Sequence, residues 1–124
     1  MSTNFIARLN KCEAAFHLLV LLSLADGSSA PKEKKIILDF LEKNFDDGLD
    51  LIKEQAFLTA LPTTEHFSHF EEVINRFYTI SSKDERNKIV EFAMKVVMAD
   101  KTMTADENRL IDKLFTAWDL NRWS

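Results

Sequence analysis

Apolar side chains recur along most of this chain at intervals of three and four residues, the spacing of one face of an α-helix. The densest apolar segment, Ala14 to Ala25, is interrupted only by His17 and Ser23. A helix over this segment would be hydrophobic on nearly all sides, so we expect it to lie at the centre of the fold. Two glycines and two prolines in the whole chain leave few places for hairpin turns, which also favours helices joined by short loops.

Residues that begin and end helices divide the chain into six expected helices. Gly27 follows the central helix where its backbone must turn, Pro31 suits the first turn of the next helix, and Pro62 ends the third. Residues 46–48 read as a turn. The expected helices cover residues 4–25, as one continuous helix or a short one before the central one, then 31–44, 49–61, 63–78, 82–99 and 104–118.

Two pairs of side chains are spaced as capping boxes, in which a hydroxyl and a carboxylate three residues later satisfy free amides at a helix start. They are Ser82 with Glu85 and Thr104 with Glu107, and Thr63 or Thr64 is expected to cap the fourth helix. The side chains expected to be buried include Phe5, Leu9, Phe16, Leu19, Leu22, Ile36, Ile37, Phe40, Leu41, Phe67, Phe70, Val73, Ile74, Phe77, Tyr78, Ile89, Ala93, Val96, Val97, Leu110, Ile111, Leu114, Phe115 and Trp118.

Length and composition narrow the possible classes of protein. Residues 1–124 suffice for a single domain that buries about two-thirds of its unfolded surface, so no metal or disulfide is needed for folding. Cys12 is the only cysteine, which excludes a disulfide within one chain and suits the cytoplasm. Twenty acidic against sixteen basic residues argue against a nucleic-acid partner. The apolar run of the central helix is shorter than the roughly 20 residues of a membrane span.

Three histidines raise the question of a metal centre. We expect His17 to be a satisfied core or boundary histidine rather than a ligand. His66 and His69 lie three residues apart and can share a helix face, but the Glu-x-x-His pattern of di-iron bundles is absent from the chain. We therefore do not predict a histidine metal site.

Two stretches of the chain match each other at an offset of 74 residues: LLSLADGSSAPKEKKIILDFL and KVVMADKTMTADENRLIDKLF. In this register Asp26 aligns with Asp100, and Glu33 aligns with Glu107. Duplicated helical hairpins in one small domain usually pack about an approximate two-fold axis. We therefore expect an internal pseudo-two-fold repeat that can bring the two acidic loops near each other.

The four acidic residues have two interpretations. In the first interpretation their roles are only local. Glu107 completes a capping box, Glu33 is favoured by the positive end of its helix dipole, and the two aspartates accept hydrogen bonds in local turns. Alternatively, Asp26 and Asp100 lie beside free carbonyl oxygens at helix ends, where a hard cation such as Ca²⁺ or Mg²⁺ finds its preferred oxygen ligands. The loops are not EF-hands, because Ser28 and Ala30 stand where ligands are needed. Basic side chains can also balance the acids, which would make the site structural; they are Lys32, Lys34, Lys101 and Arg109.

The same two stretches, LADGSSAPKEKKIILDFL and MADKTMTADENRLIDKLF, resemble the paired A-D-G-x-x-x-x-x-E elements of the TerB-like tellurite-resistance family, over Glu13 to Trp118. The resemblance implies an all-α bundle of about seven helices with an acidic, divalent-cation-binding surface at Asp26, Glu33, Asp100 and Glu107. Members act in tellurite and chemical-stress resistance, in the cytoplasm or at the inner face of the membrane with partner proteins. Similar domains are also attached to DnaJ-type co-chaperones. Lys101 stands where the family prefers glycine, and Lys32 where a second acid is common.

We therefore expect a non-enzymatic, cytoplasmic module that binds Ca²⁺ or Mg²⁺ weakly or docks a protein partner, through which it can associate peripherally with a membrane. One alternative is a pure interaction or oligomerisation domain, a co-chaperone-type adaptor, with Trp118 and Trp123 as anchors. Another is a metal-assisted hydrolase that uses the same carboxylates. The sequence shows no nucleophile beside a histidine, no glycine-rich phosphate loop and no paired histidines with a carboxylate, so we assign no catalytic residue.

Overall fold

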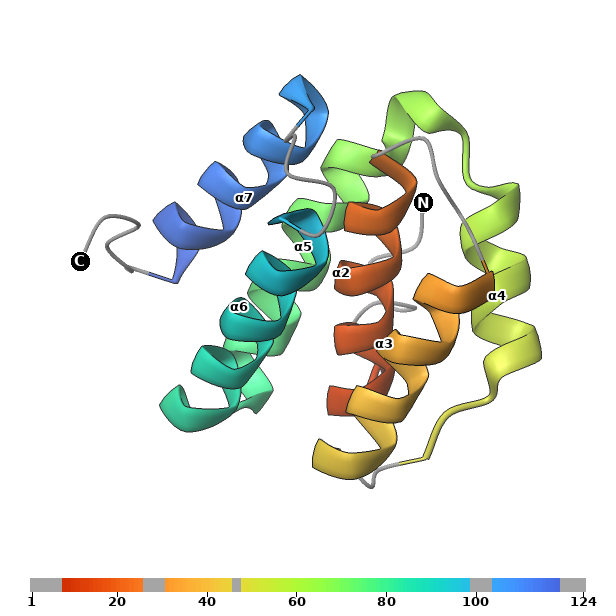
Figure 1. The fold of residues 1–124 in the computed structure, drawn as a ribbon, viewed down its shortest axis with the longest axis vertical. Helices are drawn as coiled ribbons and strands as arrows, with labels where there is room; N and C mark the ends of the chain where they lie inside the picture. The colour runs from red at the N-terminus through yellow and green to blue at the C-terminus, as the bar shows by residue number, and fades with distance from the viewer. Residues whose placement is uncertain (1–7, 26–30, 46–47, 99–103, 119–124) are drawn as a thin grey trace.

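The computed structural model describes residues 8–25, 31–45, 48–98 and 104–118, and only the backbone of residues 31–34 and 96–98 within them. In these segments every regular element is a helix, which confirms the predicted all-α bundle (Figure 1). The elements are α2 (Lys11–Ala25), α3 (Pro31–Asn44), α4 (Leu51–Ala60), the 3₁₀-helix η1 (Thr63–Glu65), α5 (His66–Ile80), α6 (Lys83–Met98) and α7 (Ala105–Ala117).

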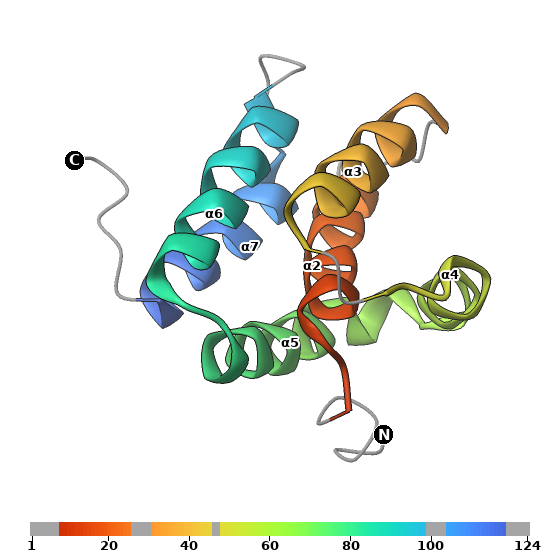
Figure 2. The ribbon, with the colours of Figure 1, turned by 90° about the horizontal axis from the view of Figure 1, so that it is seen from below.

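Helix α2 occupies the centre of the bundle, as its apolar sequence predicts. It packs against α3, α4, α5, α6 and α7, and eleven of its fifteen residues are buried. Figures 1 and 2 show it enclosed by the helices around it. An α-helix with no polar face is stabilised most in this position, because all of its apolar sides are removed from water.

Helix α5 forms the second large part of the core. Its apolar stripe of Phe70, Val73, Ile74 and Phe77 is fully buried, and the helix packs against α2 and α7. The prediction that Tyr78 belongs to this stripe is wrong, since its side chain is 48% exposed. The guanidinium of Arg86 lies 4.3 Å from the centre of the exposed Tyr78 ring.

Helix α3 covers α2 with a narrower face than its sequence suggests. Ile37 and Leu41 are buried, whereas Ile36, also expected inside, is 46% exposed. The reason is that α3 packs mainly on α2, so that only a single stripe of its surface is covered. Phe40, at the margin, stacks on Phe92 of α6 with the ring centres 4.1 Å apart.

Helix α4 lies at the edge of the molecule in both views (Figures 1 and 2). It packs chiefly on α2 and buries Glu54 and Leu58. The side chain of Asp50 caps its first turn by accepting a hydrogen bond from the backbone amide of Lys53. Before it, Gly48 takes a φ of +92°, a conformation that favours glycine, in agreement with the turn predicted there. Residues 46–47 of that turn lie outside the described segments.

Both predicted capping boxes are present. The hydroxyls of Ser82 and Thr104 accept hydrogen bonds from the amides of Glu85 and Glu107, whose carboxylates accept in return from the amides of Ser82 and Thr104. The cap predicted for the fourth helix is wrong. The η1 turn precedes α5, and no side chain caps the first turn of α5.

The helix bounds follow the predicted duplication, but the packing does not. Helix α3 begins at residue 31 and α7 at residue 105, which is the 74-residue offset of the sequence match. However, α3 packs on its predecessor α2, whereas α7 packs chiefly on α5. The internal two-fold repeat therefore remains a prediction from sequence.

Candidate functional site

Of the four acidic residues predicted to form a site, the structure describes the side chain of Glu107 alone. This carboxylate is 2% exposed and accepts a hydrogen bond of 2.9 Å from the backbone amide of Thr104. Glu107 thus has the capping role that was one of its two interpretations. Asp26 and Asp100 lie outside the described residues, and for Glu33 only the backbone, in the first turn of α3, is described.

The segments that carry Asp26 and Asp100 are joined at their described ends. The hydroxyl of Thr104 donates a hydrogen bond of 3.3 Å to the backbone oxygen of Ala25, the last residue of α2. Carbonyl groups in the last turn of a helix have no partner within it, and Thr104 provides one here. Ala25 directly precedes Asp26, and Thr104 follows Asp100 by four residues. The two stretches that the sequence match paired therefore meet in space at this hydrogen bond.

A hollow of about 450 Å³ lies beside this junction. The guanidinium of Arg109 lies 4.0 Å from the centre of the Phe67 ring at its wall, a cation–π contact between α7 and α5. The lining residues are Leu21, Leu24, Ala25, Thr63, His66, Phe67, Asp106, Arg109 and Leu110. The hollow thus combines an apolar floor with charges of both signs. Arg109, expected from sequence as a possible counter-charge, borders this same region.

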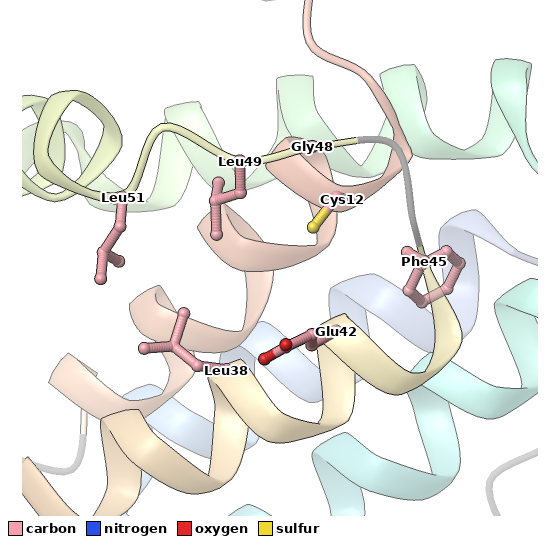
Figure 3. A pocket seen from close by; sticks show the side chains of 7 residues that line it. All are labelled: Cys12, Leu38, Glu42, Phe45, Gly48, Leu49 and Leu51. Atoms are coloured by element: carbon pink, nitrogen blue, oxygen red, sulfur yellow. The ribbon is translucent and has the colours of Figure 1, made fainter.

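A second hollow, of about 320 Å³, lies between α3 and the approach to α4. Figure 3 shows Leu38 and Glu42 of α3 on one side and Leu49 and Leu51 on the other, with Cys12 of α2 behind them. Phe45 and Gly48 complete the lining, and Glu42 is its charged group. Nothing in the sequence marked this hollow in advance.

The polar cluster that sequence reasoning missed lies deep inside the molecule. His17 of α2 contacts two buried side chains: its Nε2 is 2.7 Å from Oε1 of Glu54 on α4, and its Nδ1 is 2.8 Å from Nε2 of His69 on α5. All three residues are at most 1% exposed. The ring of Phe57 packs against both imidazoles, at 5.7 Å from His17 and 5.2 Å from His69.

The protons of this cluster are constrained by its geometry. A carboxylate only accepts hydrogen bonds, so an ionised Glu54 requires a proton on Nε2 of His17. The contact between His17 and His69 needs one proton between its two nitrogens and has no room for a second. On the far side of the cluster, Nδ1 of His69 is buried without a hydrogen-bond partner.

His69 is held in its neutral form by these surroundings. Burial lowers its pKa from the ordinary 6.5 to about 4, and the nearby charges of His17 and His66 act in the same direction. His66, which the sequence placed on the same helix face as His69, makes a different contact, and its Nε2 donates to the backbone oxygen of Leu61 at 3.2 Å. The expectation of a satisfied core histidine at His17 is met, with partners that the sequence did not reveal.

The cluster is not arranged as a metal centre. Glu54 and His69 lie against opposite nitrogens of His17, so one ion between His17 and His69 would be out of reach of Glu54. Across the described residues, no group of three or more histidine, cysteine, aspartate or glutamate side chains is placed to hold a metal ion.

Trp118, considered from sequence as a surface anchor, belongs to the core. It is 4% exposed, its Nε1 donates to the backbone oxygen of Ile74 at 3.2 Å, and its ring stacks on Phe77 with the centres 5.5 Å apart. Trp123 lies outside the described residues. The anchor interpretation is therefore wrong for Trp118.

A family model described as "Tellurite resistance protein TerB" matches residues 12–122. No curated protein and no solved structure matched the chain. Among the described residues, no helix has the length and apolar character needed to cross a membrane.

Proposed function

The chain belongs to the TerB family of tellurite resistance proteins, and we propose that it acts as a non-enzymatic module in resistance to tellurite and related chemical stress. In this proposal the module binds Ca²⁺ or Mg²⁺ weakly through Asp26, Glu33, Asp100 and Glu107. It works in the cytoplasm together with protein partners of the resistance system. The support comes from the family match and from the junction between the two acidic stretches.

The observation that carries the proposal is the hydrogen bond from Thr104 to the backbone oxygen of Ala25. Asp26 directly follows Ala25 in the sequence, and Asp100 precedes Thr104 by four residues. Because consecutive Cα atoms are about 3.8 Å apart, the chain length limits how far each aspartate can lie from this hydrogen bond. Carboxylates brought to within about 4 Å repel each other by about 1 kcal/mol in water and about 4 kcal/mol at an effective dielectric constant of 20. A divalent cation relieves that repulsion, and an all-oxygen ligand set suits Ca²⁺ or Mg²⁺.

The junction also explains why we propose weak binding. One carboxylate oxygen of Glu107 already accepts the amide hydrogen of Thr104, so this residue brings at most its other oxygen to an ion. Lys32 and Lys101 add positive charge to the two stretches. Each basic side chain reduces the binding free energy of a metal ion, because it neutralises part of the negative charge that would attract the ion.

Isothermal titration with CaCl₂ and MgCl₂ tests the metal proposal. We expect heats of binding for the unmodified chain and their loss in the Asp26→Asn, Asp100→Asn double variant. A matched control is Asp39→Asn, Asp84→Asn, which removes the same charge from exposed positions on α3 and α6 and should leave the heats unchanged. Equal heats from the unmodified chain and the Asp26, Asp100 variant would refute metal binding at this site.

The hollow beside the junction favours a second candidate function, the docking of a protein partner. Its apolar floor and its mixed charges, Arg109 and Asp106 on α7, are typical of a site that takes one side chain of a partner. Growth on tellurite separates the two functions in a host that depends on this chain for resistance. Loss of protection in Arg109→Glu with intact cation binding indicates docking, whereas loss only in the Asp26, Asp100 variant indicates the ion.

We propose no catalytic role. The polar groups with chemistry suited to proton transfer, Glu54, His17 and His69, are at most 1% exposed and are enclosed by α2, α4 and α5. A substrate would have to displace core side chains to reach them. A metal-assisted hydrolase would instead have to use the acidic stretches, and its signature would be hydrolysis that requires Ca²⁺ or Mg²⁺ and disappears in the Asp26, Asp100 variant.

A further inference from the structure

We propose that the chain of contacts from Glu54 through His17 to His69 is a proton-operated latch: it holds α4 on the core while His69 is neutral, and it releases α4 when His69 takes up a further proton. The latch is independent of the acidic stretches and of the function proposed for them. It makes the position of α4 sensitive to pH.

The geometry limits how many protons the cluster can hold. With an ionised Glu54, the contacts require one proton on Nε2 of His17 towards the carboxylate and one between His17 and His69. A third can sit on Nδ1 of His69, which is buried and has no acceptor. These three protons amount to one imidazolium beside one carboxylate, so the cluster stays neutral overall.

A fourth proton breaks the arrangement. If the rings take it up, it must enter the contact between His17 and His69, where it places an N–H group against another N–H group at 2.8 Å. If the carboxylate of Glu54 took it up instead, the His69 ring would stay neutral, and the ring measurement described below distinguishes the two cases. On the rings, the fourth proton has a second effect. It also creates two positive rings side by side in a buried environment, where charge interactions are strong. The pair then has to separate, and water has to reach it.

Helix α4 is the part of the structure that can give way. It lies at the edge of the bundle (Figure 1). Glu54, which contacts His17, and Phe57, which packs on both rings, fix it over the cluster, and Leu58 is its buried apolar side chain. Helices α2 and α5, in contrast, share a continuous apolar core that includes Phe16, Phe70 and Ile74. Elements with few buried apolar contacts open at lower free energy than the core. Release of α4 uncovers the two rings on α2 and α5, so that water hydrates them and the side chains can turn apart.

Two described groups act electrostatically on the two histidines, from two helices. They are Glu54 on α4 and His66 on α5, and the latter lowers the affinity of His69 for a proton. The ion pairs of the other helices that pack on α2 lie elsewhere: Lys35 with Asp39 on α3, Glu85 of α6 with Lys11, and Lys113 of α7 with Glu71 of α5. The response of the latch is therefore set by the cluster together with His66.

The test follows backbone amide signals of the full chain by ¹H–¹⁵N NMR while the pH is lowered from 7 to about 3.5. Amides of Lys53, Ala56 and Thr59 report on α4, and those of Asn108, Asp112 and Thr116 report on α7. We expect the α4 signals to leave their native positions between the ordinary histidine pKa of 6.5 and the lowered value of about 4, with the α7 signals still in place. Simultaneous loss of both sets would show general acid unfolding and would overturn the latch.

The decisive variant is His69→Gln, in which the amide group can still donate to Nδ1 of His17 but does not titrate. We expect its α4 transition to move down by about one pH unit or more, or to merge with global unfolding. The matched control is His66→Gln, which removes a histidine of the same helix outside the latch and should shift the midpoint by less than about 0.5 pH units. An α4 midpoint in His69→Gln equal to that of the unmodified chain would refute the proposal.

A second measurement covers the case in which His69→Gln does not fold. The ring carbon-bound hydrogens of His69 in the unmodified chain report its protonation directly. A common midpoint for the His69 ring and the α4 amides supports the latch. A His69 ring that stays neutral while α4 is released overturns it.

Discussion

At the scale of single residues, the main feature is the neutral, buried state of His69. Because the pKa of His69 is lowered to about 4 in the folded chain and returns to 6.5 on unfolding, the unfolded chain binds more protons between these values. The contribution of His69 to stability is therefore complete above pH 6.5 and decreases as the pH falls towards 4. At 1.36 kcal/mol per unit, the full loss amounts to about 3 kcal/mol.

We expect urea unfolding to show this loss as a lower free energy of unfolding at pH 4.5 than at pH 7. The His69→Gln variant should lose about 2 to 3 kcal/mol less over the same interval, since its side chain does not titrate. Glu85 contributes to acid sensitivity in both proteins: burial raises its pKa, but hydrogen bonds from Ser82 and Lys11 outweigh this and lower it. An identical pH dependence in the two proteins would mean that His69 is not neutral in the fold.

At this scale, the sequence predicts whether a side chain is buried, but it does not predict which residues the side chain contacts. The position of His17 inside an apolar run shows that its ring is buried and must be satisfied. Its partners cannot be read in the same way, because Glu54 and His69 lie 37 and 52 residues away on different helices. The exposure of Ile36 and Tyr78 was mispredicted for a similar reason: each lies at the margin of a stripe whose width depends on the neighbouring helix.

At the scale of elements, helix starts were predicted well where a capping box fixes them. Ser82 with Glu85 and Thr104 with Glu107 lie within four residues, so the interaction is already specified by the local sequence. The start of α5 was mispredicted because a 3₁₀ turn at residues 63–65 replaces a side-chain cap. Such a turn depends on how Pro62 and Leu61 leave α4, which a capping pattern does not describe.

The cap of α7 gives a prediction of its own. Thr104→Ala removes the bond to the amide of Glu107 and the bond to the backbone oxygen of Ala25, whereas Ser82→Ala removes a capping bond alone. We expect Ser82→Ala to reduce the free energy of unfolding by about 1 kcal/mol and Thr104→Ala by about 2 kcal/mol. Chemical denaturation measures both.

Thr104→Ser serves as the control, because its hydroxyl can make both bonds. It should recover most of the stability that Thr104→Ala loses. Equal losses in Thr104→Ala and Ser82→Ala would show that the bond to Ala25 adds nothing to the fold, and this would also weaken the junction on which the proposed ion site depends.

At the scale of the whole molecule, the central position of α2 predicts where the fold is most sensitive. Leu19 is fully buried in the middle of α2, and Leu58 is buried on α4 at the edge. We expect Leu19→Ala to cost about 2–5 kcal/mol and to shift the unfolding of all helices together. We expect Leu58→Ala to expose α4 amides to hydrogen exchange before the amides of α5 and α7.

Native-state hydrogen exchange distinguishes the two variants, since it resolves partial opening from global unfolding. Uniform acceleration in Leu58→Ala would indicate that α4 is as tightly integrated as α2. That result would argue against α4 as a separately released element.

More of the fold than of the candidate site could be predicted from the sequence. An all-α bundle around residues 14–25 follows from the apolar pattern, and the family follows from two short acidic elements. The packing of α7 on α5 rather than as a copy of α3 on α2 could not be predicted, because the sequence match fixes helix bounds and not their partners. The meeting of the acidic stretches is supported only at Ala25 and Thr104.

The lack of a polar side on α2 has a consequence for how the protein is made. This helix leaves the ribosome before α3, α4, α5, α6 and α7, the helices that later shield it from water. Throughout that interval these helices do not yet shield the apolar segment, and exposed apolar surface of this kind binds chaperones and promotes aggregation in their absence. Synthesis rate and chaperone supply should therefore govern the yield of this protein more than the final stability of its fold does.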